Sequence, residues 1–117
     1  MRKQLLAWQW SLYPSAHADR RNLLIHALTV PFFLAGTLGV LSAWRSPWLA
    51  LGGVAAMAGA MALQGRGHAR EGVAPVPFAG PADALTRIFA EQWITFPRFV
   101  LGGGFARAWR AAETAKP

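Results

Sequence analysis

The sequence predicts an all-α integral membrane protein, built as a helical hairpin with flanking interfacial helices. Three observations predict this class. Of the 117 residues, 54% are apolar and only 15% are charged, against roughly a quarter charged in a typical soluble domain. Two uncharged apolar runs occupy residues 23–43 and 48–65, and a short segment that includes Arg45 and Pro47 separates them. Helices joined by so short a turn must run antiparallel.

Each apolar run is long enough to cross a bilayer. A helix rises about 1.5 Å per residue, so residues 23–43 would extend roughly 30 Å, the thickness of a hydrocarbon core. Trp44 and Trp48 bracket the turn, where interfacial aromatic residues are expected. Small residues at four-residue spacing would let the two helix backbones approach closely. These are Ala35, Gly39 and Ala43 in the first run, and either Ala55 and Gly59 or Gly52, Ala56 and Ala60 in the second.

The flanking segments complete a single membrane domain over residues 1–117. Leucines, tryptophans and basic residues over about 3–13 predict a short interfacial helix that ends near Pro14. Residues 86–105 are apolar but contain Glu91, Pro97 and Arg98, which make a full membrane span expensive. We therefore expect this segment to be interfacial or re-entrant and to pack against the hairpin. Residues 106–117 form a polar tail.

The basic residues are distributed unequally between the two ends of the hairpin. Lys and Arg outnumber Asp and Glu by 12 to 5, for a formal charge of +7. The turn holds Arg45 alone, whereas the opposite end holds Arg2, Lys3, Arg20, Arg21, Arg66, Arg70 and Arg87. The positive-inside rule then places the N-terminus and both hairpin ends on the cytoplasmic side. The expected partner is the lipid bilayer. Long uncharged runs argue against nucleic-acid binding, and a chain without cysteine has neither disulfides nor thiolate ligands.

All three histidines are expected at that same end of the hairpin. His26 lies 20 residues before Ser46 at the tip and His68 lies 22 after it, so antiparallel helices bring them to nearly equal depth. His17 precedes the first span on the same side. His17 is about half a helical turn out of phase with His26, so it joins them only if the chain breaks between Pro14 and Arg21.

Polar residues accompany the histidines at helical spacing. Gln64, His68 and Glu71 follow one another at i, i+4 and i+7, and Asn22 and His26 at i and i+4. Imidazoles and a carboxylate that converge in a partly dry site are typical ligands of non-haem iron, and also suit zinc or manganese. Two histidines could instead ligate haem. The competing interpretation is interfacial histidines without a metal, with Glu71 paired to an arginine.

At these residues the sequence resembles the family of small membrane 2-hydroxy fatty acid dioxygenases. The resemblance covers about residues 13–105 and is carried by two motifs in the expected order on either side of the hairpin. The first motif is Tyr13, His17, Asn22, His26 and Pro31, and the second is Gln64, Gly67, His68, Glu71 and Pro75.

The resemblance implies an iron(II)-dependent enzyme that shortens a 2-hydroxy fatty acid by one carbon with molecular oxygen and without 2-oxoglutarate. The expected metal ligands are His17, His26, His68 and Glu71. Glu71, Asn22 and Gln64 are the expected catalytic residues, and Tyr13, Arg66 and Arg70 would bind the substrate. The metal site would face the cytoplasm, and the protein could form a homo-oligomer. The alternative function is that of a non-catalytic membrane hairpin that organises a membrane or a larger complex.

Overall fold

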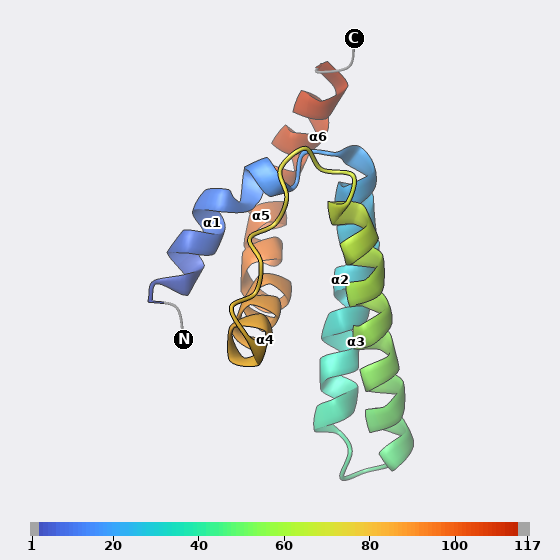
Figure 1. The fold of residues 1–117 in the computed structure, drawn as a ribbon. Coiled ribbons are helices and arrows are strands. Elements are labelled where there is room, and N and C mark those ends of the chain that lie inside the picture. Colours follow the sequence, from blue (N-terminus) through green and yellow to red (C-terminus); the bar gives the residue numbers. More distant parts are fainter. Residues whose placement is uncertain (1–2, 115–117) are drawn as a thin grey trace.

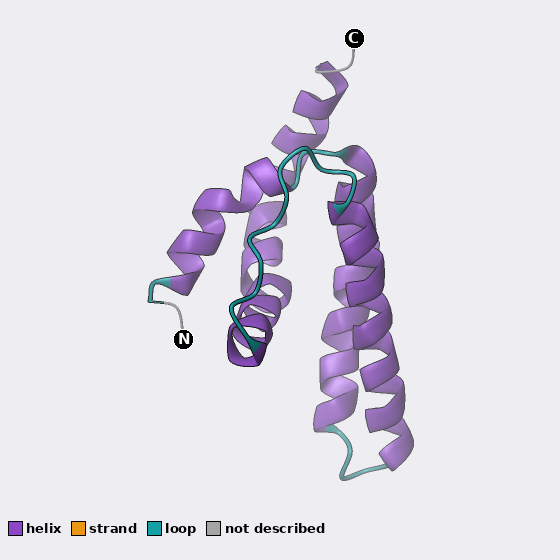
Figure 2. Cartoon of the chain, viewed as in Figure 1, coloured by secondary structure: helices purple, strands orange, loops and turns teal. Residues whose placement is uncertain are grey.

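The computed structural model describes residues 3–114, and within that range every regular element is helical (Figures 1 and 2). This confirms the predicted all-α class. Arg2 and residues 115–117 of the predicted polar tail lie outside the described residues. The elements are α1 (Leu5–Ala16), α2 (Arg20–Leu41), α3 (Pro47–His68), α4 (Pro81–Ala90), the π-helical turn η1 (Glu91–Thr95), α5 (Phe96–Leu101) and α6 (Gly104–Thr114).

The two longest helices, α2 and α3, pack side by side and antiparallel (Figure 1). Both are long and apolar enough to cross a membrane. The Asp19 side chain caps α2 by accepting from the backbone N–H groups of Arg21 and Asn22. Ser46 caps α3, and Pro47 occupies the first helical position, where its missing N–H costs nothing. Helix α2 therefore begins at Arg20, before the predicted start at residue 23. Helix α3 continues past the predicted end at residue 65 to His68.

Glycine allows the closest approach of α2 and α3, at Gly39, which the predicted stripe includes, and at Gly36 and Gly53, which it does not. A Cβ at Gly36 would lie 2.6 Å from the carbonyl oxygen of Gly53, and one at Gly39 would lie 2.8 Å from that of Leu49. By contrast, a Cβ at Gly52 or Gly59 would meet no heavy atom within 4 Å. Several small-residue stripes run along these helices, and spacing alone does not say which one faces the partner.

Residues 81–101 form one helical rod that changes its winding in the middle. Over Glu91–Thr95 the rod becomes a π-helix, in which the N–H of Phe96 donates to the carbonyl of Glu91. Pro97 explains the change, because it has no N–H and its ring would clash with the carbonyl four residues earlier. The rod packs on α2, where Phe33 contacts Phe89 with ring centroids 5.2 Å apart and Trp93 donates to Thr37. The segment predicted as interfacial or re-entrant is thus helical and lies along the α2–α3 pair.

The terminal helices α1 and α6 pack against the same rod and the start of α2. Gln9 of α1 donates to the carbonyl of Arg87 and accepts from Thr95. Arg20 of α2 donates to the carbonyl of Trp109 in α6 and stacks over its ring at 4.4 Å. Between these helices lies a buried core, which comprises Tyr13, Leu23, Val30, Phe96 and Phe99. The core borders the end of the molecule that contains the histidines.

Candidate metal centre

The three histidines converge at the end of the α2–α3 pair opposite the Ser46 turn. His17 follows α1, His26 lies near the start of α2, and His68 is the last residue of α3. The ring centroids are 4.6 Å apart for His17 and His26, 4.8 Å for His17 and His68, and 5.0 Å for His26 and His68. The hairpin geometry predicted this meeting.

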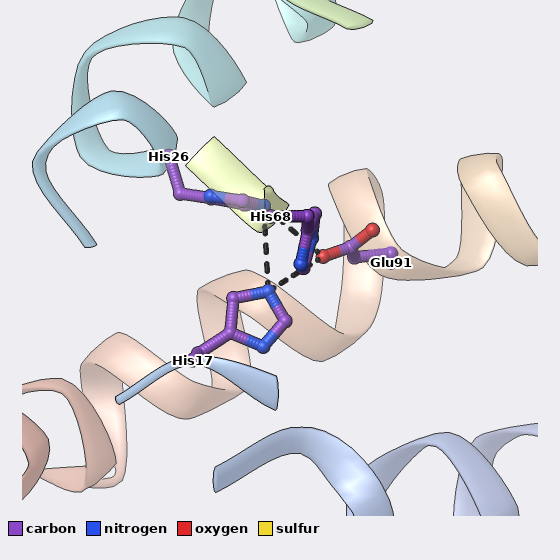
Figure 3. A group of neighbouring side chains, drawn as sticks. All are labelled: His17, His26, His68 and Glu91. Carbon is purple, nitrogen blue, oxygen red and sulfur yellow. Dashed lines mark hydrogen bonds and ion pairs between the residues drawn. The ribbon is translucent and has the colours of Figure 1, made fainter. Parts of the chain in front are cut away.

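Glu91 joins the three histidines from η1. Its Oε2 lies 3.3 Å from Nε2 of His17 and 3.5 Å from Nε2 of His26. One ligand atom from each of the four residues lies within 4.8 Å of all the others, a group that could hold a metal ion. Figure 3 shows the four side chains pointing toward one another. We call His17, His26, His68 and Glu91 the His–Glu cluster.

The expected chain break brings His17 into this cluster. Helix α1 ends at Ala16 and α2 begins at Arg20, and between them His17 takes a non-helical conformation. His17 is 3% exposed and His26 is fully buried. The break turns the His17 ring back onto His26, so that their Nε2 atoms lie 3.3 Å apart.

The hydrogen bonds of His17 and His26 leave their Nε2 atoms as acceptors. Nδ1 of His17 lies 2.9 Å from the carbonyl oxygen of Tyr13, and Nδ1 of His26 lies 3.0 Å from that of Asn22. Because a carbonyl oxygen only accepts, each Nδ1 carries the ring hydrogen of the neutral imidazole. The two Nε2 lone pairs then face each other and an oxygen of Glu91. Acceptors that face only acceptors repel, so this arrangement suits a bound cation.

His68 and Glu91 also favour a bound cation at this site. Nδ1 of His68 is buried without a hydrogen-bond partner. Oε2 of Glu91 lies 3.3 and 3.5 Å from the Nε2 atoms of His17 and His26. The cluster therefore gathers a carboxylate and imidazole nitrogens around one point.

Tyr13 supports both Glu91 and His17. Its hydroxyl donates to Oε2 of Glu91 at 2.8 Å, and its ring stacks on the His17 imidazole with centroids 3.8 Å apart. Burial and the neighbouring Glu91 carboxylate raise the pKa of Tyr13 well above its usual value, so the hydroxyl stays protonated and remains a donor. Tyr13, which the resemblance implies in substrate binding, hydrogen-bonds a cluster residue through this hydroxyl and also lines the adjoining cavity.

Glu71, the carboxylate expected to complete the cluster, has other partners. Its oxygens accept from the backbone N–H groups of Ala18 and Asp19 at 3.0–3.2 Å and from Nδ2 of Asn22 at 2.8 Å. The expectation assumed that α3 would continue past His68, which would keep Glu71 on the histidine face. Because α3 ends at His68, Glu71 turns toward the start of α2 and fastens the α1–α2 connection. The structure thus places Glu91, and not Glu71, beside the three histidines.

The two expected supporting amides are buried near the cluster. Asn22 is fully buried and donates to Glu71, and a Cβ at Gly67 would collide with its Oδ1, which accounts for the glycine before His68. Gln64 forms a reciprocal amide pair with Gln92 of η1, with N···O distances of 3.0 and 2.7 Å. Gln64 also donates to Thr29. The amide pair ties α3 to the residue beside Glu91.

A cavity of about 470 Å³ adjoins the cluster, and the predicted substrate-binding arginines lie outside its lining. Arg66 and Arg70 are exposed, and Arg70 pairs with Asp19 at 3.4 Å. The arginine in the lining is Arg87. The polar and aromatic residues of the lining include Tyr13, His17, His68, Glu91 and Gln64.

Glu91 and Gln92 are the site residues that sequence reasoning missed. An ionisable residue inside an apolar segment is itself a sign of function, and Glu91 is such a residue. Its charge instead served only to argue against a membrane span. Gln92 had no comparable signal.

Comparison with protein-family models, with curated proteins and with solved structures finds no match for this chain.

Proposed function

We propose that this protein is an integral membrane enzyme that uses iron(II) and molecular oxygen to shorten 2-hydroxy fatty acids by one carbon. The observation that carries the proposal is the convergence of two imidazole Nε2 lone pairs, His68 and the Glu91 carboxylate. The two sequence motifs that resemble the membrane 2-hydroxy fatty acid dioxygenases supply three of these four residues.

The exposed surfaces of α2 and α3 support insertion into a membrane. In the most apolar window of each helix, only 33% of α2 and 17% of α3 is buried within the protein. A core helix of a soluble protein would be mostly buried. Large side chains instead face outward, among them Leu28, Phe32 and Leu41 of α2 and Leu51 and Val54 of α3. Apolar surface on this scale marks an interaction site, and lipid is the partner that fits two long parallel faces.

The sidedness follows from the same charge asymmetry as in the sequence. Arg45 lies at the turn between the helices, whereas Arg20, Arg66 and Arg70 lie at the end that holds the His–Glu cluster. The positive-inside rule places the cluster at the cytoplasmic boundary.

The donor set is compatible with iron(II), and the proposed oxygen chemistry is what selects iron from the metals that these ligands suit. Three imidazoles and one carboxylate are hard-to-intermediate ligands, which suit iron, zinc or manganese and offer no thiolate for copper(I). Bound iron would supply the redox chemistry that activates oxygen. A reaction in which R–CH(OH)–COOH and O₂ yield R–COOH, CO₂ and H₂O balances without another reductant, which agrees with the absence of 2-oxoglutarate from the implied reaction.

The surrounding side chains would hold the ligands in place for this chemistry. The carbonyls of Tyr13 and Asn22 fix the ring orientation of His17 and His26, and the Tyr13 hydroxyl fixes Oε2 of Glu91. Such outer partners typically change metal affinity or activity by 10–100-fold when they are removed. The adjoining cavity gives a substrate access to the cluster.

Oxygen uptake tests the proposed reaction. Purified protein in lipid nanodiscs is loaded anaerobically with iron(II) and then given 2-hydroxyhexadecanoate and oxygen. We expect oxygen uptake matched by pentadecanoate formation, none with hexadecanoate, and none in His26→Ala. Uptake that survives in His26→Ala would contradict the assigned centre. A wild-type protein that binds neither iron nor substrate would instead support the non-catalytic hairpin.

A further inference from the structure

The cavity beside the His–Glu cluster has a largely apolar lining. Besides the cluster residues and a few polar groups, the side chains that line it are hydrophobic, and they include Trp8, Leu12, Met61, Val76, Phe78 and Ile88. Its volume of about 470 Å³ falls within the range of small-molecule sites, roughly 300–1,000 Å³. His17, His68 and Glu91 form part of its wall, so a ligand in the cavity reaches the cluster directly.

One wall of the cavity is a segment without regular structure, residues 75–78, held in place by Arg87. The Arg87 guanidinium donates to the carbonyls of Val76 at 2.7 Å and Pro77 at 3.1 Å, and it pairs with Asp83 at 3.2 Å. It lies over the rings of Trp8 and Phe78, at 5.0 and 4.5 Å from their centroids. Arg87 is 8% exposed. Arg87 therefore fixes the position of residues 75–78 along the cavity.

A stripe on α3 forms another part of the lining. Met61, Gly65 and His68 all line the cavity and follow one another at i, i+4 and i+7, on one face of the helix. Gly65 is the gap in this stripe, because a Cβ there would meet no heavy atom within 4 Å. The open space at Gly65 lies one turn before His68.

We propose that this cavity holds the hydrocarbon chain of the substrate, and that Gly65 keeps the chain's path to the His–Glu cluster open. The inference rests on the proposed function, because it takes the head group of the same ligand to lie at the cluster. An apolar cavity with metal-ligating atoms in its wall fits an amphiphile with one polar end. The chain would lie between α3 and the 75–78 segment, and not along the outer faces of α2 and α3.

Photolabelling locates the chain directly. The probe is 2-hydroxyhexadecanoate with a diazirine at carbon 10, added to the full-length protein in phosphatidylcholine nanodiscs with and without iron. After irradiation, peptide mass spectrometry identifies the labelled residues. We expect adducts on Met61 and on residues 75–78. Adducts confined to outward-facing residues such as Leu28 and Phe32 would place the chain in the bilayer and overturn the inference.

Substitutions on α3 test the role of Gly65. In the series Gly65→Ala, Gly65→Val and Gly65→Leu, cavity labelling should fall progressively, by about tenfold or more for leucine, since the loss of only two buried methylenes has that effect. Gly59→Leu is the matched control. Gly59 is in the same helix with equally open space around it, but it does not line the cavity. Undiminished labelling in Gly65→Leu would overturn the inference.

Iron content and turnover separate this inference from the proposed function. Gly65→Leu should retain its iron while it loses labelling and turnover of the long-chain acid. Full turnover in Gly65→Leu would overturn the cavity assignment and leave the enzyme assignment standing. Cavity labelling in a wild-type protein that binds no iron and consumes no oxygen would support a lipid-binding cavity and overturn the proposed reaction.

Discussion

The segment after α3 and the π-turn η1 each bring a glutamate to the histidine end of the molecule, and the two carboxylates meet opposite kinds of partner. Glu71, after α3, is surrounded by donors: two backbone N–H groups and the amide of Asn22. Glu91, in η1, faces the Nε2 atoms of His17 and His26, with one donor from Tyr13. The first carboxylate is satisfied by the protein, and the second still suits a cation. The partners of a carboxylate, more than its distance from a histidine, therefore distinguish a structural role from a ligand.

The largest expected effect is on the stability that metal binding adds, which Glu91→Gln should remove. Metal that binds only the folded protein stabilises it, by about 2.7 kcal/mol at a free concentration 100 times the Kd. We expect iron(II) to raise the thermal midpoint of the wild type and to leave that of Glu91→Gln almost unchanged. In the absence of metal, Glu91→Gln should be at least as stable as the wild type, because its amide N–H can donate to the imidazole lone pairs. A metal response of wild-type size in Glu91→Gln would argue against Glu91 as a ligand.

The matched substitution Glu71→Gln should have the opposite pattern. Hydrogen bonds to a charged group contribute about 1.5–3 kcal/mol each, and Gln cannot accept from all three donors as the carboxylate does. We expect the unfolding free energy to fall by roughly 2 kcal/mol with and without metal, measured by denaturant titration in detergent micelles. The increment that iron adds should persist. Loss of that increment alone would show that Glu71 acts on the metal.

Substitutions in the amide pair between Gln64 of α3 and Gln92 of η1 should lower the unfolding free energy by a smaller amount, and their effects should be coupled. Gln92→Met leaves the buried Gln64 amide without one of its partners, at a cost of about 1–2 kcal/mol, and loosens the turn that presents Glu91. Gln64→Met/Gln92→Met should cost less than the sum of the single variants, because the two amides satisfy each other. A double-mutant cycle from unfolding titrations measures the coupling. Strict additivity would mean that the pair does not act as a unit.

The smallest effect is expected for Tyr13→Phe. This change removes one hydrogen bond to Oε2 of Glu91 and keeps the ring that stacks on His17, so iron affinity should fall by about tenfold. Competition with a chelator measures the affinity. Ser11→Ala, on the same helix with an exposed hydroxyl bonded to the carbonyl of Trp8, is the control and should leave iron affinity unchanged. An equal loss in both variants would indicate damage to α1 and not to the cluster.

The same two segments show how far the sequence predicts the site. The meeting of His26 and His68 could be predicted because two apolar runs and a short turn fix their depth, and His17 followed from the break that Pro14–Arg21 composition suggested. The position of Glu91 could not be predicted, because it depends on how residues 81–101 fold back and on the π-helical winding before Pro97. Glu71 was misplaced because the end of α3 at His68 has no strong stop signal. The contact between Gly36 and Gly53 could not be predicted, because several small-residue stripes run along these helices and spacing does not distinguish them.

The iron content of three proteins distinguishes Glu91 from Glu71 as the metal-binding carboxylate. Wild type, Glu91→Gln and Glu71→Gln are loaded with limiting iron(II), passed through a desalting column and assayed by mass spectrometry for iron per chain. We expect about one iron per chain for wild type and for Glu71→Gln, and little for Glu91→Gln. Iron retained by Glu91→Gln but lost from Glu71→Gln would show that Glu71, and not Glu91, binds the metal.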